Sequence, residues 1–483
     1  MAYMYTTSKE AWVARLTETM PLTALDHTAP QNYILRCFGF PFCPSPRNLN
    51  RHAAIAYLKW RLVRAFSLLP FLEGQIIHGW DGELPRLVYP GNVLPSKLDL
   101  FSYEVFDYQV FESSRFPWSF EELSALGVPA ETMAKDLFWL LPKTGPAPSD
   151  ACHPITLRAS FIDGGLILGF AFHHGVMDGT GTVDFLNYFA TDTYNGIGTL
   201  WGCKQNFIAF AAETARTTPV DPRFMPGYDF TPERSPPTLP PAIAKVLTIS
   251  APRAAALQAA AQTHLRAAHG PRAFASTTDV LCALTWLHVT RARLLAGRIA
   301  PTDTTPLRDS RNLWLRALAS STVGDLVQDI SHSGKVTTEQ IAEAAWCIRQ
   351  AVMEMDDPAT FRAHLAIAAR ASSDEDEGIA WPEVGAAVSR AMARHSTGLD
   401  ASVHIGLGAD VEFEIRGVRG GKRKAVWVRR AYVPNDGAMN LLPRIGGTKG
   451  EADWQVWLAL REEDMRVMEE QGELGAWLSR PAA

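Results

Sequence analysis

The sequence predicts an α/β protein of two domains, and three observations support this prediction. With 483 residues the chain is too long for one ordinary hydrophobic core. Short apolar runs that are typical of strands alternate with longer segments in which apolar residues follow the spacing of a helix. A proline-dense segment without periodicity, residues 215–243, predicts a linker. We therefore expect an N-terminal domain over residues 1–214 and a C-terminal domain over residues 244–483.

The first half of the chain opens with strand and helix signals in turn. The apolar run YILRCFGFPF, which begins at Tyr33, predicts a buried strand, and residues 49–69 carry apolar positions at helical spacing. Two further strands are expected around the turn at Asp81-Gly82, because Asp-Gly between apolar runs favours a hairpin.

The clearest local pattern is a hairpin that leads into a polar motif. Residues 155–162 and 166–172 read as two strands joined by a turn at Asp163-Gly164-Gly165. The second strand runs directly into HHGVMDG, residues 173–179, and a helical pattern follows. The motif is therefore expected at a strand-to-helix junction, where side chains can be held rigidly and still face a cleft.

The second half begins with a strand-like run, KVLTIS, and an alanine-rich helical pattern over residues 251–269. A second helix is expected over residues 276–297, with Ser276 or Thr277 as its N-cap.

Composition excludes several classes of function. The formal net charge of -5 gives no basic surface for nucleic acid, and no apolar run is long enough to span a bilayer. The first residues lack the apolar core of a secretory signal, so we expect a cytoplasmic protein. The six cysteines are scattered without a CxxC pair, which favours reduced thiols and predicts no metal site.

HHGVMDG is the motif that carries chemistry. A pattern HHxxxDG is expected by chance on the order of 0.001 times in a chain of this composition. A nucleophile that attacks a thioester must lose a proton, and histidine is the side chain best matched to that task near neutral pH. We assign His174 as the general base. Its tautomer and orientation must be fixed by a rigid mount.

The other residues of the motif receive supporting roles. His173 is interpreted as a structural or substrate-lining residue. Asp178 is expected to support the loop, for example through a salt bridge to an arginine, rather than to act as the acid of a triad. Gly179 is expected to adopt a backbone conformation closed to other residues. The chain contains no GxSxG elbow, Walker A sequence or GxGxxG fingerprint, which argues against serine hydrolysis and nucleotide-dependent chemistry.

HHGVMDG at the end of an apolar strand, in a two-domain chain of this length, resembles the BAHD acyltransferases, and most closely their fungal trichothecene 3-O-acetyltransferase-like subgroup. Three other segments carry the same resemblance: MPLTALDHTAP (20–30), PFLEGQI (70–76) and STTDVLCALTWLHVTRAR (276–293). The stretch RDSRNLWLRALASSTVGDLV is similar to a family segment through Asp309, Arg311, Gly324 and Asp325.

The second family hallmark, DFGWG, is altered in this sequence. Its best match begins with Glu412-Phe413-Glu414 and lacks both glycines. In the family this motif is mostly structural, so we expect Glu412 to pair with Arg311. The basic run at residues 416–424 is interpreted as a solvated loop, with coenzyme A phosphates as the alternative partner.

The resemblance implies two chloramphenicol-acetyltransferase-like lobes, each a mixed β-sheet flanked by helices, with a solvent channel between them. It implies a monomeric acyltransferase for groups other than amino-acyl groups. Acyl-coenzyme A would be a co-substrate and no cofactor would stay bound. Both substrates would bind together, and an acyl group, expected to be acetyl, would pass to a hydroxyl of a terpenoid or polyketide without an acyl-enzyme.

Two alternatives remain open from the sequence. A free-standing condensation-like domain uses the same HHxxxDG motif but takes its acyl group from a carrier protein. A repurposed member of the family would bind or cyclise a metabolite without acylating it, and the altered DFGWG-like segment keeps this second alternative open.

Overall fold

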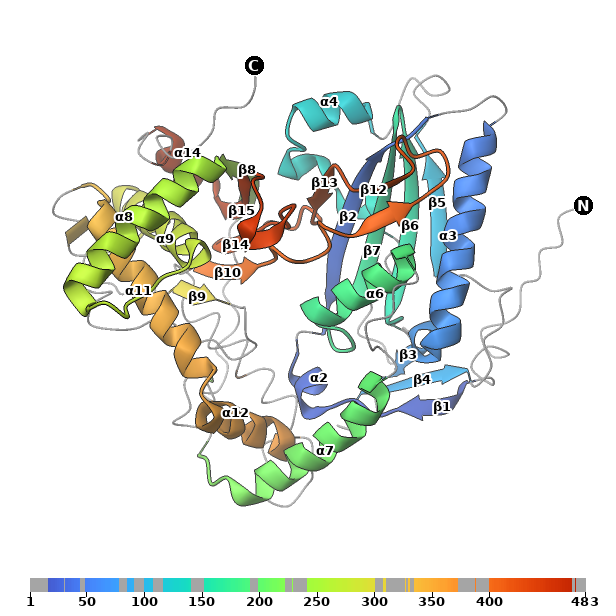
Figure 1. The fold of residues 1–483 in the computed structure, drawn as a ribbon, viewed down its shortest axis with the longest axis horizontal. Helices are drawn as coiled ribbons and strands as arrows, with labels where there is room; N and C mark the ends of the chain where they lie inside the picture. The colour runs from blue at the N-terminus through green and yellow to red at the C-terminus, as the bar shows by residue number, and fades with distance from the viewer. Residues whose placement is uncertain are drawn as a thin grey trace, which may run out of the picture.

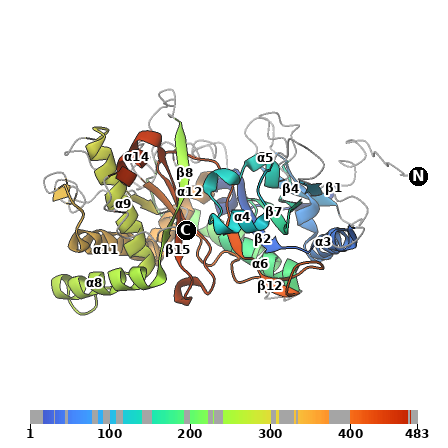
Figure 2. The same ribbon diagram turned by 90° about the horizontal axis from the view of Figure 1, so that it is seen from above.

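The structure is a computed structural model of the chain. It describes residues 16–29, 31–43, 48–77, 85–90, 100–106, 116–139, 152–191, 199–221, 228, 241–299, 307–309, 326, 329–330, 334–371, 387, 399–470 and 474. Figure 1 shows two lobes side by side, and Figure 2 shows the same pair from above.

A mixed five-stranded sheet forms the centre of the N-terminal lobe. Neighbouring strands run antiparallel, except for the last pair, which is parallel. The order is β13 (Trp427–Arg429), β2 (Tyr33–Pro41), β7 (Gly165–His173), β6 (Ile155–Ile162) and β5 (Phe101–Val105).

The hairpin predicted from the sequence forms the middle of this sheet. β6 and β7 pair in one uninterrupted register, and Asp163 and Gly164 make the turn. Gly164 has a φ of +65°, a backbone conformation that glycine adopts without strain. Every residue of β7 is buried, which explains its continuous apolar run.

Helices cover both faces of the N-terminal sheet. On one face lie α3 (Leu49–Leu68) and α6 (Gly179–Thr191), over a core rich in phenylalanine. On the other face lie α4 (Phe120–Ala125) and α5 (Lys135–Phe138). The short η3 (Ala130–Thr132) comes between them in the chain, and its Ala130 packs against Ala244 and Trp457 of the C-terminal lobe. α5 approaches so closely that the carbonyl oxygen of Phe138 leaves no room for a Cβ on Gly169.

Small elements complete this lobe. An antiparallel sheet contains β1 (Leu16–Met20), β4 (Arg86–Pro90) and β3 (Gln75–Ile77), with η2 (Pro70–Glu73) before β3. The short helix α2 (Ala24–Thr28) precedes β2 and begins with a capping box between Thr23 and Asp26.

The C-terminal lobe repeats the plan with a second mixed sheet. Its order is β8 (Ala242–Ile249), β15 (Trp454–Arg461), β14 (Ala438–Leu441), β10 (Leu399–Val403) and β9 (Leu307–Asp309). The first three strands are antiparallel neighbours, and β14, β10 and β9 are parallel. Its helices are α8 (Ala251–His269), α9 (Thr277–Leu295), α11 (Thr338–Met355) and α14 (Glu462–Glu470), and the short η5 (Gly447–Lys449) precedes β15.

The two predicted helices of this half form at the expected residues. α8 covers residues 251–269, and α9 begins after Ser276. Ser276 makes a capping box with Asp279, since its hydroxyl accepts the Asp279 N–H while the carboxylate accepts the Ser276 N–H.

The lobes are not two consecutive stretches of chain. β13, from the second half of the sequence, pairs with β2 of the N-terminal sheet. The ribbon of β11 (Glu412–Glu414) and β12 (Lys422–Lys424) also packs on that lobe, where Phe413 contacts Phe38 and Phe40. Residues 409–430 thus pack on the N-terminal lobe and form part of it. The predicted boundaries stay a prediction, because most of residues 215–243 lie outside the described residues.

A pair of long helices joins the lobes on another side. α7 (Thr199–Thr217) packs against α12 (Pro358–Ala371), and α2 completes their small core. Arg370 of α12 donates hydrogen bonds to the carbonyls of Ala215, Thr218 and Val220 where α7 ends. Among the described residues, no helix combines the length and apolar character that a bilayer crossing requires.

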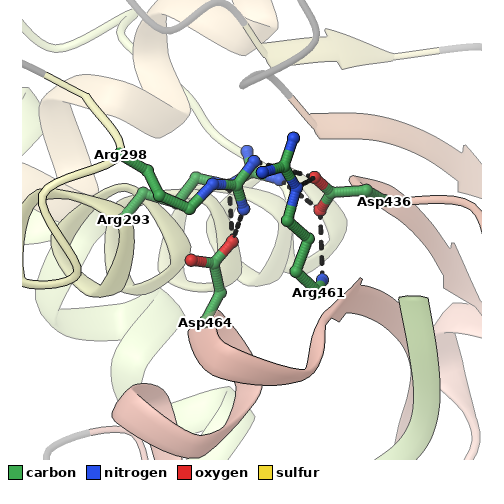
Figure 3. A network of polar contacts seen from close by, with 5 residues as sticks. All are labelled: Arg293, Arg298, Asp436, Arg461 and Asp464. Atoms are coloured by element: carbon green, nitrogen blue, oxygen red, sulfur yellow. Dashed lines mark hydrogen bonds and ion pairs between the residues drawn. The ribbon is translucent and has the colours of Figure 1, made fainter. Parts of the chain in front are cut away.

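A buried ionic network holds the C-terminal lobe together (Figure 3). Asp436, in the turn before β14, accepts from Arg293 and Arg298 at 2.9 Å each and from Arg461 at 3.2 Å. Arg293 and Arg298 also contact Asp464 of α14. Burial would raise the pKa of Asp436, but Arg293 and Arg298 hold it below its usual range, so the carboxylate stays charged.

We predict that Asp436→Asn destabilises the protein by about 3–5 kcal/mol, because it removes one of the two carboxylates that balance the charges of Arg293, Arg298 and Arg461 in this buried network. Urea unfolding would measure this loss. The matched control is Glu470→Gln, which removes an exposed ion pair with Arg466 and is expected to leave the urea midpoint unchanged. Equal midpoints for the two variants would contradict the prediction.

Candidate active site

HHGVMDG lies where the sequence predicts it, between the end of β7 and the start of α6. The His173 N–H donates to the Pro154 carbonyl, and the His174 N–H donates to the Asn32 carbonyl, each at 2.9 Å. These bonds extend the pairing of β7 with its two neighbouring strands by one step. The backbone of both histidines is therefore fixed by the sheet.

The middle of the motif is clamped as well. The N–H groups of Val176 and Met177 donate back to the His173 carbonyl at 3.0 and 3.1 Å. The Val176 side chain is buried against Ile76 and Leu87 of the small sheet. The loop is thus packed on both sides, which gives its side chains the rigid mount that a general base requires.

His174 is half-buried, and its burial favours the neutral ring. Burial lowers its pKa below 6.5, and Arg36 acts in the same direction, whereas Asp178 and a contact with the His174 backbone oppose the shift. The buried Nδ1 atom has no partner in standard hydrogen-bond geometry among the described residues. A neutral imidazole is the form that can accept a proton.

His173 occupies a different environment from its neighbour. Its side chain is 2% exposed and meets the ring of Tyr33 edge to face at a centroid distance of 5.2 Å. Tyr33 in turn donates from its hydroxyl to the His153 carbonyl at 2.8 Å. This packing supports the structural interpretation of His173.

Asp178 begins helix α6. Its carboxylate accepts the Gly181 N–H at 2.8 Å, and its carbonyl accepts the Thr182 N–H at 3.0 Å, which is the geometry of an N-cap. Among the described residues Asp178 forms no salt bridge to an arginine. The support that the sequence led us to expect from an ion pair comes instead from this cap.

Gly179 leaves room for a side chain of the other lobe. Its φ lies outside the left-handed region, so the backbone freedom expected from the sequence is not what this position uses. A Cβ at Gly179 would lie 3.2 Å from the side chain of Leu407, which follows β10 of the other lobe. The glycine thus admits a close approach between the lobes at the start of α6.

Sequence reasoning missed two side chains near this loop. Arg36 of β2 is buried, and its Nη2 lies 2.7 Å from Nδ1 of His404, the first residue after β10. Burial lowers the pKa of Arg36 to about 9, and it lowers the pKa of His404 well below 6.5. A lone arginine inside YILRCFGFPF was the available signal for Arg36, since buried charges are rare in apolar strands.

The DFGWG-like segment forms strand β11. Phe413 is 1% exposed in the core of the N-terminal lobe. Glu412 is exposed and makes a 3.2 Å ion pair with Lys422 of β12. Arg311 lies outside the described residues, so its pairing with Glu412 stays a prediction. Of the four residues named in the similar family segment, Asp309 is described, as the end of β9, and Arg311, Gly324 and Asp325 lie outside the described residues.

The basic run at residues 416–424 forms the end of this ribbon. Lys422 is paired with Glu412, and Lys424 makes a 2.6 Å ion pair with Asp410. The Arg419 Nε lies 3.0 Å from Sγ of Cys43. Much of the basic charge is therefore neutralised locally or bound to the lobe, which fits the interpretation as a solvated loop.

Comparison with known proteins assigns the family. Residues 139–475 match the Transferase family, and residues 33–192 match the trichothecene 3-O-acetyltransferase-like N-terminal domain. The chain belongs to the BAHD transferase family. Within that family it is a member of the trichothecene acetyltransferase-like subgroup, which confirms the resemblance found in the sequence.

The relatives come from fungal metabolism. The chain is 30% identical over 146 residues to trichothecene 8-O-acetyltransferase of Fusarium sporotrichioides, covering 30% of this chain and 29% of that protein. It is 24% identical over 308 residues to the eremophilane O-acetyltransferase ORF8 of Penicillium roqueforti, covering 57% and 62%. The chain thus spans less than two thirds of either relative.

A solved structure confirms the fold. The crystal structure of F. graminearum TRI101 with coenzyme A and T-2 mycotoxin has a TM-score of 0.67 at 19% identity. It covers 96% of this chain and 100% of that one. The predicted architecture of two α/β lobes with mixed, helix-flanked sheets is therefore confirmed.

We predict that, in the pH–rate profile of the acyl transfer expected from the sequence, kcat/KM falls on the acid side, the acid limb, with a midpoint below pH 6.5. His174 must be neutral to accept a proton, and because its pKa is lowered, activity falls only as the pH drops through that lowered value. A pH–rate profile between pH 4.5 and 8, within the range where the protein stays folded, measures the limb. A limb above pH 7 would contradict this assignment.

Two replacements of Asp178 distinguish its role as the N-cap of α6 from the effect of its charge on His174. Asp178→Ala loses the hydrogen bond to Gly181 and is expected to cost about 1 kcal/mol of stability. Asp178→Asn keeps an acceptor oxygen and should retain most of that stability. Since the Asp178 charge raises the pKa of His174, the asparagine variant should move the acid limb to lower pH. Urea unfolding and pH–rate profiles test the pair, and equal destabilisation by both replacements would refute the capping role.

Proposed function

We propose that the protein is a coenzyme A-dependent O-acyltransferase that transfers an acetyl group to a hydroxyl of a terpenoid or polyketide. The observation that carries the proposal is His174, held by the sheet at the end of β7 with its ring in the neutral form, in a chain of the BAHD transferase family. The names of the relatives support the substrate class, since both curated proteins are O-acetyltransferases.

The chemistry proceeds in two steps around one base. His174 takes the proton of the acceptor hydroxyl as its oxygen adds to the thioester carbonyl. The imidazolium then returns the proton to the sulfur as the tetrahedral intermediate collapses, which gives the ester and free coenzyme A. Because one histidine serves both steps, no acyl-enzyme is required, and both substrates bind together.

Acyl-coenzyme A acts in this proposal as a co-substrate. Crystal structures of F. graminearum TRI101 contain coenzyme A with T-2 mycotoxin or with deoxynivalenol, which supports a thioester donor and a small-molecule acceptor for this chain as well. The substrates would meet in a channel between the lobes beside the HHGVMDG loop. The cytoplasmic location and the monomeric state stay predictions.

His174→Ala tests the proposal. The variant is expected to lose at least about 100-fold in turnover of acetyl-coenzyme A, measured as free thiol, with deoxynivalenol and a panel of other hydroxylated terpenoids and polyketides as acceptors. Its thermal unfolding should match that of the unsubstituted protein, because the His174 contribution to the fold is a backbone hydrogen bond.

The same assay separates the alternatives. Product formed only from a carrier-protein thioester, without release of coenzyme A thiol, would favour the condensation-like domain. Binding or cyclisation of a panel compound without acylation would favour a repurposed member. Full turnover by His174→Ala would remove His174 as the base.

A further inference from the structure

His404 is mounted on the C-terminal sheet much as His174 is mounted on the N-terminal one. Its N–H donates to the Leu441 carbonyl at 2.8 Å, which continues the pairing of β10 with β14 by one residue. Its carbonyl accepts the Leu407 N–H at 2.9 Å and closes a turn. The backbone from which the imidazole ring projects is therefore held in place at the end of a strand.

The turn after His404 brings the C-terminal lobe onto the His174 loop. Leu407 lies against Gly179, and Gly408 lies against Leu186 of α6 and Phe38 of β2. Figure 1 shows β10 directed from its own lobe toward β2 and α6. The two histidines thus come from different lobes and lie at one junction, close enough that protonation of His174 would lower the pKa of His404.

Arg36 determines which nitrogen of His404 carries the proton. A guanidinium group can only donate, so Nδ1 of His404 must accept the 2.7 Å hydrogen bond from Arg36. The neutral ring then carries its proton on Nε2. Burial, Arg36 and Arg430 all lower the pKa of His404, so the second proton is absent at neutral pH.

The Nε2–H group of His404 is left for a substrate. Among the described residues, Arg36 is the side chain that bonds the ring, and it occupies Nδ1. His404 lies deep between the lobes, yet its side chain is only half-buried. Because part of the side chain reaches solvent and no described residue bonds Nε2, this donor is available to a bound molecule.

We propose that His404 is the oxyanion donor of the acyl transfer, with Nε2–H aimed at the thioester carbonyl oxygen and Arg36 as the residue that sets its tautomer. This inference rests on the proposed acyltransferase function and adds a second histidine to it. The other imidazole, His174, removes the proton from the acceptor.

The reaction balances with these two rings. The acceptor O–H gives its proton to His174, the oxygen forms a bond to the carbonyl carbon, and the carbonyl π electrons move to its oxygen. Nε2–H of His404 donates to that oxyanion without transferring its proton. When the intermediate collapses, the C–S bond breaks and the sulfur takes the proton from His174.

The charges around His404 suit an oxyanion. Burial and, after it, the nearby charge of Arg430 lower the pKa of Arg36 to about 9, and burial lowers the pKa of Arg430 to about 10. The carboxylate of Asp400 opposes the effect of burial, because its charge raises the pKa of Arg430. A positive guanidinium behind the imidazole also polarises Nε2–H, which makes it a stronger donor.

The kinetic test compares two replacements of His404 with the unsubstituted protein. His404→Met removes the donor and is expected to lower kcat by about 100-fold or more, with KM for acetyl-coenzyme A changed by less than about 3-fold, because the oxygen gains charge only in the transition state. His404→Gln places an amide N–H near the position of Nε2 and should recover at least about a tenth of kcat. His269→Gln, a surface histidine paired with Glu343, is the matched control and should keep full activity.

A spectroscopic test reads the tautomer without any turnover. In ¹⁵N-histidine-labelled protein, the His404 resonances, assigned from their loss in His404→Gln, should show a protonated Nε2 and an unprotonated Nδ1 between pH 6 and 8. A ring with Nδ1 protonated, or charged at pH 7, would overturn the proposal, since neither fits the hydrogen bond from Arg36.

The outcomes separate this inference from the proposed function. Acetyl transfer by the unsubstituted protein with undiminished kcat in His404→Met overturns the role of His404 and leaves His174 untouched. Absence of transfer to any acceptor in the panel counts against the proposed function, and the tautomer measurement then still decides the state of His404. If His404→Met fails to fold, the tautomer decides, and a ring with Nδ1 protonated refutes the proposal.

Discussion

Nine consecutive residue pairs join β2 to β7 in one antiparallel register, and the chemistry of the site depends on that register. It ends with Tyr33 opposite His173, so the next step places the Asn32 carbonyl at the His174 N–H. It also places Arg36 on the strand that faces His404. A shift by one residue would turn every side chain of β2 to the opposite face and separate the arginine from its histidine.

At the junction between the lobes, two glycines let side chains of the facing segments come close to the backbone. Gly179 and Gly408 lie where side chains of the facing segment come within about 3 Å of a Cβ position. Such close approach brings two strand ends, from two sheets, within electrostatic reach of each other. Burial then keeps both imidazoles neutral, while nearby guanidinium groups supply the positive potential that a developing negative charge requires.

Much of the fold follows from patterns that act over short distances. The hairpin of β6 and β7, helix α8 and the capped start of α9 depend on turn residues, helical spacing and a local serine, all of which are legible along the sequence. The motif that carries His174 was found in the same way, because its residues are contiguous.

The contacts that sequence reasoning missed connect residues far apart in the chain. Arg36 and His404 are separated by 368 positions, and no local pattern relates them. The N-cap role of Asp178 could have been predicted, because an aspartate just before a helical pattern favours an N-cap, but the sequence interpretation gave a salt bridge as its example of support. Pairing of β13 with β2 depends on tertiary packing and leaves no periodic signal.

Residues 409–430 come from the second half of the chain but complete the N-terminal lobe, and this has a consequence for biosynthesis. β2 emerges from the ribosome well before its outer partner β13, because residues 42–426 are made between the two strands. For most of that interval one side of β2 presents unpaired backbone groups, and its neighbouring residues are among the most apolar of the chain. The nascent polypeptide must therefore shield this edge, or have it shielded by a chaperone, until β13 has been made.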